Sequence, residues 1–145
     1  MPHEREVPSR HVGQVVHADP SAVYDFASDV ANLPVWASGL ATSGVRVEGD
    51  HLVVDSPMGS VRVRFVARNA LGVLDHDVTL PSGTVVHNPF RVLPHPDGSE
   101  LLFTVRQIEL TDEEFARDVE TVRQDLERLA RHIESLGSAA DPLTG

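Results

Sequence analysis

One histidine occupies a position from which it could carry chemistry. His76 lies in the middle of the segment Leu74-Asp75-His76-Asp77-Val78, and strand alternation places it on the apolar face with Leu74 and Val78. An imidazole on such a face can act as a general base or as a hydrogen-bond anchor for a ligand. The competing interpretation is a core histidine that bonds a neighbour.

Asn88 is the second polar candidate, on the next predicted strand. If Arg91 faces outward, then Asn88 and Phe90 face inward, and hairpin pairing can bring Asn88 close to His76. Two polar groups opposite each other across a hairpin would anchor one polar end of a ligand, unless they only bond each other. As a catalytic pair, His76 would remove a proton and Asn88 would stabilise the resulting oxyanion.

Pro89 leaves a second arrangement open. Proline cannot donate to a strand ladder, so it suggests a bulge or a sheet edge, and a bulge would turn His87 inward. A metal site is not expected, because the eight histidines form no spaced cluster such as His-Glu-x-x-His and the chain has no cysteine. No nucleotide-binding or nucleophile-elbow motif occurs, so no cofactor is expected either.

The composition is that of a globular chain with a strong negative charge. Its 145 residues suffice for one domain with a core of its own, and 41% of them are apolar. The formal net charge of −10, from 12 basic and 22 acidic side chains, disfavours binding to nucleic acid or to an anionic membrane surface. The negative net charge is most compatible with a partner that is a neutral, apolar or cationic small molecule.

We expect a cytoplasmic protein that does not insert into membranes. The first ten residues are polar and contain no apolar signal core. No segment approaches the roughly 20 apolar residues that a membrane-spanning helix needs. The absence of cysteine excludes disulfides and thiolate catalysis.

Turn signals divide the middle of the chain into short strands. Their hairpin-like spacing predicts an antiparallel meander, which follows a first strand at 11–18 and a helix opened by Asp19 and Pro20. A second helical piece should end at Leu33, before Pro34. The later strands are expected at 45–48, 51–54, 61–67, 72–80, 84–92 and 100–109.

Alternation on neighbouring strands predicts a charge pattern. Arg62 and Arg64 share one face of their strand, and Asp75 and Asp77 share one face of the next strand. We therefore expect these four side chains to meet on the solvent side of the sheet. Exposed pairs of this kind fix the strand register more than they add stability.

The C-terminal part of the chain predicts a long amphipathic helix over 111–136. Thr111 and Glu114 form a capping box, and Gly137 is expected to end the helix. Apolar residues recur at helical spacing along its length, whereas the opposite, charged face includes Asp125. Such a long apolar stripe needs a whole sheet face to cover it.

Two local motifs accompany this order of elements. The segment 18–26, Ala-Asp-Pro-Ser-Ala-Val-Tyr-Asp-Phe, resembles a helix-opening signature A-x-P-x-x-V-aromatic, and 29–36 resembles a D-x-x-x-(x)-P-x-W segment. Over essentially the whole chain, the order of elements resembles the SRPBCC or START-like helix-grip superfamily. That superfamily includes lipid-transfer START domains, birch-pollen-allergen-like proteins and polyketide cyclases or dehydratases.

The resemblance implies an α+β helix-grip fold. A curved antiparallel sheet of six to seven strands would wrap around the long C-terminal α-helix, with two short helices after strand 1. The domain would span 9–136, with a flexible N-terminal arm at 1–8 and a disordered C-terminal tail at 137–145. A cavity would lie between the sheet and the long helix, gated by the segment around Trp36 and the turn at Met58.

The resulting hypothesis is binding of a small hydrophobic molecule, such as a lipid, by a monomer or homodimer. A first alternative is a polyketide cyclase-like or dehydratase-like enzyme, in which His76 removes a proton α to a carbonyl and Asn88 stabilises the enolate oxygen. A second alternative is a protein-partner module of the chaperone co-factor kind. The predicted ligand-binding residues are Gln14, Trp36, Met58, Phe65, Leu74, His76, Asn88, Phe90 and Phe103.

Overall fold

The computed structural model describes residues 6–37, 45–49, 51–56 and 59–139. The elements follow the predicted order and confirm an α+β fold of the helix-grip type. In chain order they are β1 (Ser9–Val16), α1 (Pro20–Ser28), the 3-10 turn η1 (Val30–Asn32), α2 (Leu33–Trp36), β2 (Val45–Glu48), β3 (His51–Ser56), β4 (Gly59–Phe65), β5 (His76–Thr79), β6 (Val85–Asn88), β7 (Phe90–His95), β8 (Gly98–Arg106) and α4 (Asp112–Ala139).

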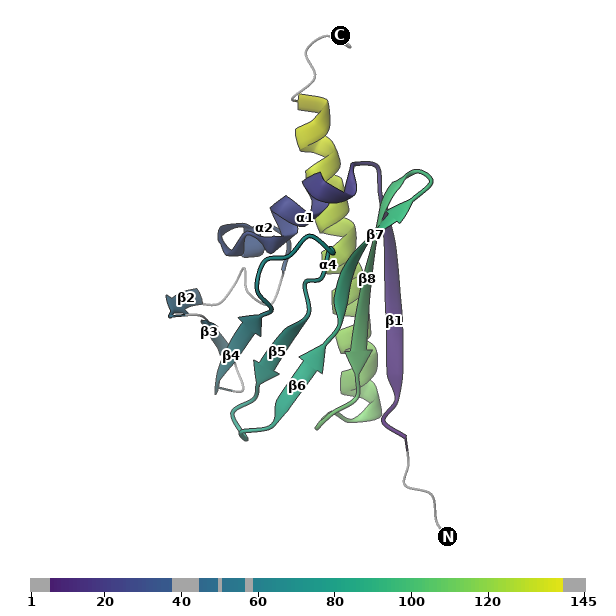
Figure 1. Cartoon of the computed structure of the whole chain (residues 1–145). Coiled ribbons are helices and arrows are strands. Elements are labelled where there is room, and N and C mark those ends of the chain that lie inside the picture. The colour runs from purple at the N-terminus through teal and green to yellow at the C-terminus, as the bar shows by residue number, and fades with distance from the viewer. Residues whose placement is uncertain (1–5, 38–44, 50, 57–58, 140–145) are drawn as a thin grey trace.

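Two antiparallel sheets form the body of the molecule. A three-stranded sheet has the order β1-β8-β7, and a five-stranded sheet has the order β2-β3-β4-β5-β6. Figure 1 shows α4 running behind β7 and β8 and alongside β1, while the five-stranded sheet fans out to one side. The described residues thus contain eight strands rather than six or seven, because the predicted strand 84–92 is two strands.

The division of that strand falls at Pro89. β6 ends at Asn88 and β7 begins at Phe90, so the chain leaves the five-stranded sheet and enters the three-stranded one. Proline causes the break because it has no amide hydrogen with which to continue the ladder. The alternation is kept all the same: Phe90 is buried and His87 is exposed, so no bulge turns His87 inward.

The long helix α4 starts as predicted and ends later. Thr111 N donates to Glu114 Oε1 at 2.8 Å, and Glu114 N donates to Thr111 Oγ1 at 3.1 Å, which confirms the capping box. The helix continues to Ala139 through Gly137, where a glycine costs only about 1 kcal/mol relative to alanine. Its buried stripe consists of Phe115, Leu126, Leu129, Ala130 and Ile133.

The short helices lie against the C-terminal half of α4. The rings of Phe26 in α1 and His132 in α4 have centroids 5.0 Å apart. Pro34 lies in the first turn of α2 rather than after a helix end, because its missing N–H breaks no bond there. Arg128 Nη1 donates to the Trp36 carbonyl at 2.9 Å and so ties the end of α2 to α4.

The core lies where α4, the short helices and both sheets meet. Within the described residues, no helix is both long enough and apolar enough to cross a membrane. The side chains with almost no exposed surface include Val16, Val23, Phe90, Leu101, Leu126 and Leu129.

Candidate ligand-binding site

A small apolar cavity, which we name the inner chamber, lies between the five-stranded sheet and α4. Its volume is about 150 Å³, close to that of an apolar cavity that holds one benzene molecule. Side chains from both sheets, α2 and α4 surround it. The lining residues are Leu33, Trp36, Ala37, Val63, Phe65, His76, Val78, Phe103, Val122, Asp125 and Leu126.

A larger and more polar cavity, which we name the outer groove, lies beside the inner chamber. It has a volume of about 940 Å³ and extends from β5 and β6 to the end of β8 and the first turns of α4. Val78 is among the lining residues of both cavities. The apolar lining of the groove includes Leu80, Val86, Ile108 and Leu110, and its charged lining is Arg106, Glu109, Glu114, Arg117 and Asp118.

His76 borders the inner chamber from β5, as the alternation predicted. Its side chain is buried, and its ring centroid lies 4.8 Å from that of Phe65 and 5.5 Å from that of Phe103. His76 Nδ1 lies 3.0 Å from the Leu74 carbonyl oxygen. A carbonyl only accepts, so this bond assigns the proton of the neutral ring to Nδ1 and leaves a lone pair on Nε2.

The surroundings of His76 favour its neutral form. Burial lowers the pKa of His76 below its ordinary value of 6.5, and the bond to the Leu74 carbonyl and the nearby Asp75 offset this only in part. At neutral pH the ring therefore presents an uncharged acceptor nitrogen. Such a nitrogen can accept a hydrogen bond from a ligand or take a proton from it.

Trp36 and Asp125 are the other polar side chains of the inner chamber. Trp36 is buried, and its Nε1 has no hydrogen-bond partner in the part of the chain that the structure describes. The Asp125 side chain is 14% exposed, and its Oδ1 accepts from Arg128 Nη1 at 3.0 Å. The same Arg128 nitrogen donates to the Trp36 carbonyl, so it holds the tryptophan and the aspartate together.

The sequence placed Asp125 on the charged outer face of the helix, and this was wrong. Asp125 lies three residues after Val122 and directly before Leu126, and all three border the inner chamber. Residues three and four apart share a helix face, so the spacing from Val122 was the signal that could have identified it.

The other predicted site residues divide between the two cavities and the core. Phe65 and Phe103 line the inner chamber, whereas Asn88 lines the outer groove. Asn88 is the register partner of His76 across β5 and β6, as hairpin pairing predicted. Leu74 and Phe90 are buried and border neither cavity, because they pack behind the chamber wall.

One predicted ligand-binding residue borders neither cavity, and another lies outside the described residues. Gln14 is half-buried on the same face of β1 as Val12 and Val16, but its Nε2 donates to the Val15 carbonyl at 2.9 Å, and it borders neither cavity. Met58 lies outside the described residues. The predicted gate at the Met58 turn therefore stays a prediction.

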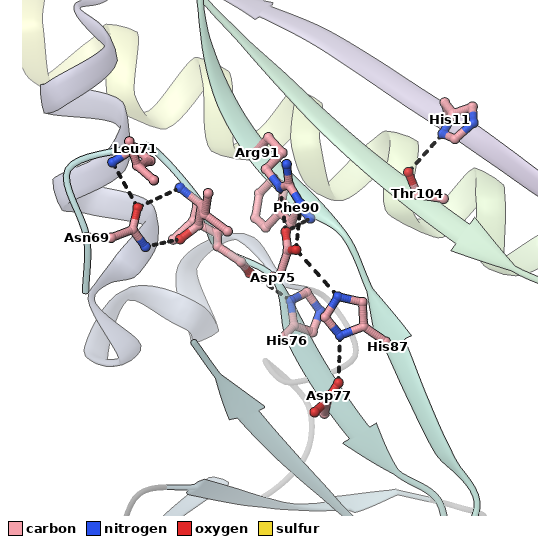
Figure 2. Close-up of polar contacts among 12 residues, drawn as sticks. His11, Asn69, Leu71, Asp75, His76, Asp77, His87, Phe90, Arg91 and Thr104 are labelled. Carbon is pink, nitrogen blue, oxygen red and sulfur yellow. Dashed lines mark hydrogen bonds and ion pairs between the residues drawn. The ribbon is translucent and has the colours of Figure 1, made fainter. Parts of the chain in front are cut away.

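Alternation predicted Asp75 on the solvent side of the sheet with the arginines of β4, and this was wrong. It is only 6% exposed, because β5 begins at His76 and the alternation does not extend back to Asp75. Its carboxylate accepts from Arg91 Nε and Arg91 Nη2, each at 2.7 Å (Figure 2). Arg64 and Asp77, by contrast, are register partners, as predicted.

The Asp75 carboxylate also bridges the break between β6 and β7. Asp75 Oδ1 accepts from Phe90 N at 2.9 Å, and His87 Nε2 lies 3.4 Å from Asp75 Oδ2. The Arg91 guanidinium is the main reason that the pKa of Asp75 falls from 3.8 to about 2. We name this network of Asp75, His87, Phe90 N and Arg91 the Asp75 clamp; it lies directly before His76 (Figure 2).

The sequence from residue 10 to residue 134 matches the profile of one protein family, described as polyketide cyclase / dehydrase and lipid transport. The chain belongs to this family. Membership in the polyketide cyclase / dehydrase and lipid transport family accounts for the helix-grip order of elements and confirms the resemblance that the sequence motifs indicated. No curated protein matches the sequence.

Solved structures support the same fold for this family member. Protein CV1439 from Chromobacterium violaceum has a TM-score of 0.67 at 15% identity, over 87% of this chain and 97% of that one. Ara h 8.0201 has a TM-score of 0.63 at 12% identity, over 90% and 99%. DynU16, a protein of the dynemicin biosynthetic locus, has a TM-score of 0.66 at 15% identity, over 87% of this chain and 47% of DynU16. Identities this low establish the fold alone.

Proposed function

We propose that this protein binds a small hydrophobic molecule whose ring-sized end lies in the inner chamber and whose remainder lies along the outer groove. The observation that carries the proposal is an apolar chamber and a more polar groove that share Val78 in their linings. Small-molecule sites are mostly apolar and span roughly 300–1,000 Å³, with a few polar groups that fix orientation. The family description, which names polyketides and lipids, points to the same class of ligand.

The charged side chains of the outer groove set where the polar part of such a ligand lies. Arg106, Glu114, Arg117 and Asp118 surround the groove, whereas the inner chamber is almost entirely apolar. The pKa of Asp118 is raised, mainly because surrounding protein atoms displace water and also because of the Asp125 carboxylate. An amphiphilic ligand would therefore bury its apolar ring and keep its polar end in the groove.

Filling the inner chamber should weaken ligand binding. Val122 borders the chamber from α4, so Val122→Phe adds a ring to a space that holds only one. After incubation with a small-molecule extract of the host and washing, mass spectrometry should find retention reduced at least about tenfold relative to wild type. Val47→Phe is the matched control, since Val47 is 65% exposed on β2. Equal retention by wild type and Val122→Phe would contradict the proposal.

A second candidate function, favoured by the lone pair on His76 Nε2, is proton removal α to a carbonyl of the bound ligand. The proton passes from carbon to Nε2, and the Asn88 amide, opposite His76 in the register, donates to the resulting enolate oxygen. The lowered pKa of His76 makes it a modest base, which fixed orientation in the chamber would offset.

This candidate predicts a particular pH dependence of α-proton exchange. His76 acts only when neutral, so exchange into deuterium oxide should rise with pH through a midpoint below 6.5 and be level by neutral pH. NMR of a retained carbonyl compound measures the exchange rate. His76→Gln, which keeps a polar side chain, should reduce the rate at least about a hundredfold. Exchange that persists in His76→Gln would exclude His76 as the base.

A further inference from the structure

We infer that the outer groove recognises a cationic nitrogen on its hydrophobic ligand, with the Asp118 carboxylate as the counter-ion. This inference rests on the proposed function and names the class of ligand. Asp118 lies on α4, lines the groove and is exposed to solvent, so a molecule that enters the groove can contact it. The apolar wall of the same groove consists of Val78, Leu80, Val86, Ile108 and Leu110.

The position of Asp118 along α4 places it on the helix face that borders the cavities. Glu114, four residues before it, and Thr121, three residues after it, also line the outer groove. Val122, four residues after it, lines the inner chamber. Residues three and four apart share a helix face, so Asp118 belongs to the face of α4 that borders the two cavities.

No basic side chain compensates the charge of Asp118 among the described residues. The positions three and four residues away on α4 carry no lysine, arginine or histidine, and Asp118 makes no hydrogen bond or ion pair within the described part of the chain. The pKa of Asp118 is raised, first by the loss of water around it and then by the Asp125 carboxylate. The carboxylate therefore lacks the stabilisation that a cation in the groove would provide.

The other acidic side chains of the groove already accept hydrogen bonds. Glu109 accepts from Ser82 Oγ at 2.9 Å and also from Thr84 Oγ1. Glu114 Oε1 accepts from Thr111 N at 2.8 Å in the capping box. Of the three carboxylates that line the groove, only the proposed counter-ion lacks a hydrogen-bond partner among the described residues.

The two arginines of the groove are placed beside other groups of the protein. Arg106 Nη1 donates to Ser9 Oγ at 2.9 Å. The pKa of Glu114 is lowered first by its hydrogen bonds with Thr111 and then by the charge of Arg117, so this arginine lies close enough to act on Glu114. An anionic ligand is the alternative that these arginines would favour, and the experiment includes one.

Three compounds with the same apolar part test this inference. They are phenylbutylamine, phenylbutanol and phenylbutyrate, in each of which the ring and the polar group lie at opposite ends of a butyl chain. At neutral pH the amine is a cation and the acid an anion, because such groups titrate near about 10 and about 4. An ammonium group loses more hydration than a hydroxyl on entering a groove, so without a counter-ion the alcohol would bind more tightly.

In wild type we expect phenylbutylamine to bind about tenfold more tightly than phenylbutanol, and phenylbutyrate to bind most weakly. Isothermal titration calorimetry measures the three dissociation constants. A salt concentration of about 0.15 M reduces the Debye length to about 8 Å, so the distant charges of the protein contribute little to the preference.

Asp118→Asn assigns the preference, because it removes the charge and keeps the size of the side chain. In this variant the preference for the amine over the alcohol should disappear or reverse, while the alcohol binds within about twofold of wild type. Asp97→Asn is the matched control: it removes the same charge from an aspartate, 66% exposed, that lines neither cavity. This variant should keep the wild-type preference. Circular dichroism establishes that both variants are folded.

The outcomes separate this inference from the proposed function. If the alcohol binds wild type as tightly as the amine, or phenylbutyrate binds most tightly, the protein binds the apolar part without the proposed selection, and only this inference is wrong. If the amine is preferred equally in wild type, Asp118→Asn and Asp97→Asn, the assignment to Asp118 is wrong. If none of the three compounds binds, the inference and the proposed function both fail.

Discussion

Replacing Asp75 with alanine should lower the free energy of unfolding by about 3 kcal/mol. The substitution removes the acceptor for three donors at once: Arg91 Nε, Arg91 Nη2 and Phe90 N. Phe90 is almost completely buried, so water cannot take over the bond to its amide. Arg91 is half-exposed and can regain hydrogen bonds to water. We therefore expect a loss of stability near the lower end of the range for a broken buried ion pair.

Urea denaturation at pH 7 measures this effect as a shift of the midpoint without a change of slope. Asp75→Asn keeps an oxygen for Phe90 N and should lose less than Asp75→Ala. Asp77→Ala is the matched control: its carboxylate is half-exposed, and removing it should cost less than about 1 kcal/mol. If Asp75→Ala and Asp77→Ala were equally stable, the Asp75 clamp would not join the two sheets.

The same clamp predicts how stability changes in acid. The pKa of Asp75 falls from 3.8 to about 2 on folding, chiefly through Arg91. Its contribution of roughly 2 kcal/mol is therefore complete above pH 3.8 and is lost as the pH falls through about 2. Stability measured between pH 5 and pH 2 should fall more steeply in wild type than in Asp75→Ala.

His87 adds a dependence of opposite sign. Asp77, and then Asp75, raise the pKa of His87 above 6.5, so its contribution is complete below pH 6.5 and is lost as the pH rises through the raised value. Because His87 is half-exposed, this effect should be smaller than that of Asp75.

Truncation of Phe90 should have an effect of similar or larger size. Phe90 is 1% exposed, and its ring centroid lies 5.1 Å from that of Phe103, 6.1 Å from that of Trp36 and 6.4 Å from that of His76. Phe90→Ala should cost about 3–5 kcal/mol, because it leaves a cavity behind the wall of the inner chamber. It should also weaken ligand retention, since the three neighbouring rings lose their support.

Phe103→Ala is the matched control for this prediction. Phe103 already borders the inner chamber and is only partly buried, so its removal forfeits fewer contacts. Urea midpoints should therefore rank wild type, Phe103→Ala and Phe90→Ala in order of falling stability. The reverse order would mean that Phe103, and not Phe90, supports the chamber wall.

Hydrophobic periodicity and turn residues made most of the fold predictable. The capping box of Thr111 and Glu114 and the helical stripe that follows specified α4, since both are local properties of the sequence. Hairpin spacing specified the pairing of His76 with Asn88 for the same reason. Two failures fell at prolines, since Pro34 opens α2 and Pro89 separates two sheets, and a third fell at Gly137, which does not end α4. Proline restricts the local backbone conformation, but it does not determine which element follows it.

The candidate site was predictable only where alternation held. His76 and Phe65 were placed correctly on the inward face by alternation, and Phe103, a predicted ligand-binding residue, also lines the inner chamber. Leu74 and Phe90 also point inward, but the volume around them is filled by neighbouring side chains, so they border no cavity. Whether an inward face encloses space depends on packing against distant elements, which periodicity does not contain.

The sequence by itself determined the order of elements, the inward position of His76 and the long helix, because these follow from local propensity and spacing. The tertiary structure alone decided three further points. It turned Asp75 into a buried bridge across the Pro89 break, brought Asp125 to the inner chamber, and left the Trp36 indole N–H without a partner. Each of these points depends on contacts between residues far apart in the chain. The packing of sheets and helices against one another determines which polar atoms are buried and which find partners, and local sequence does not.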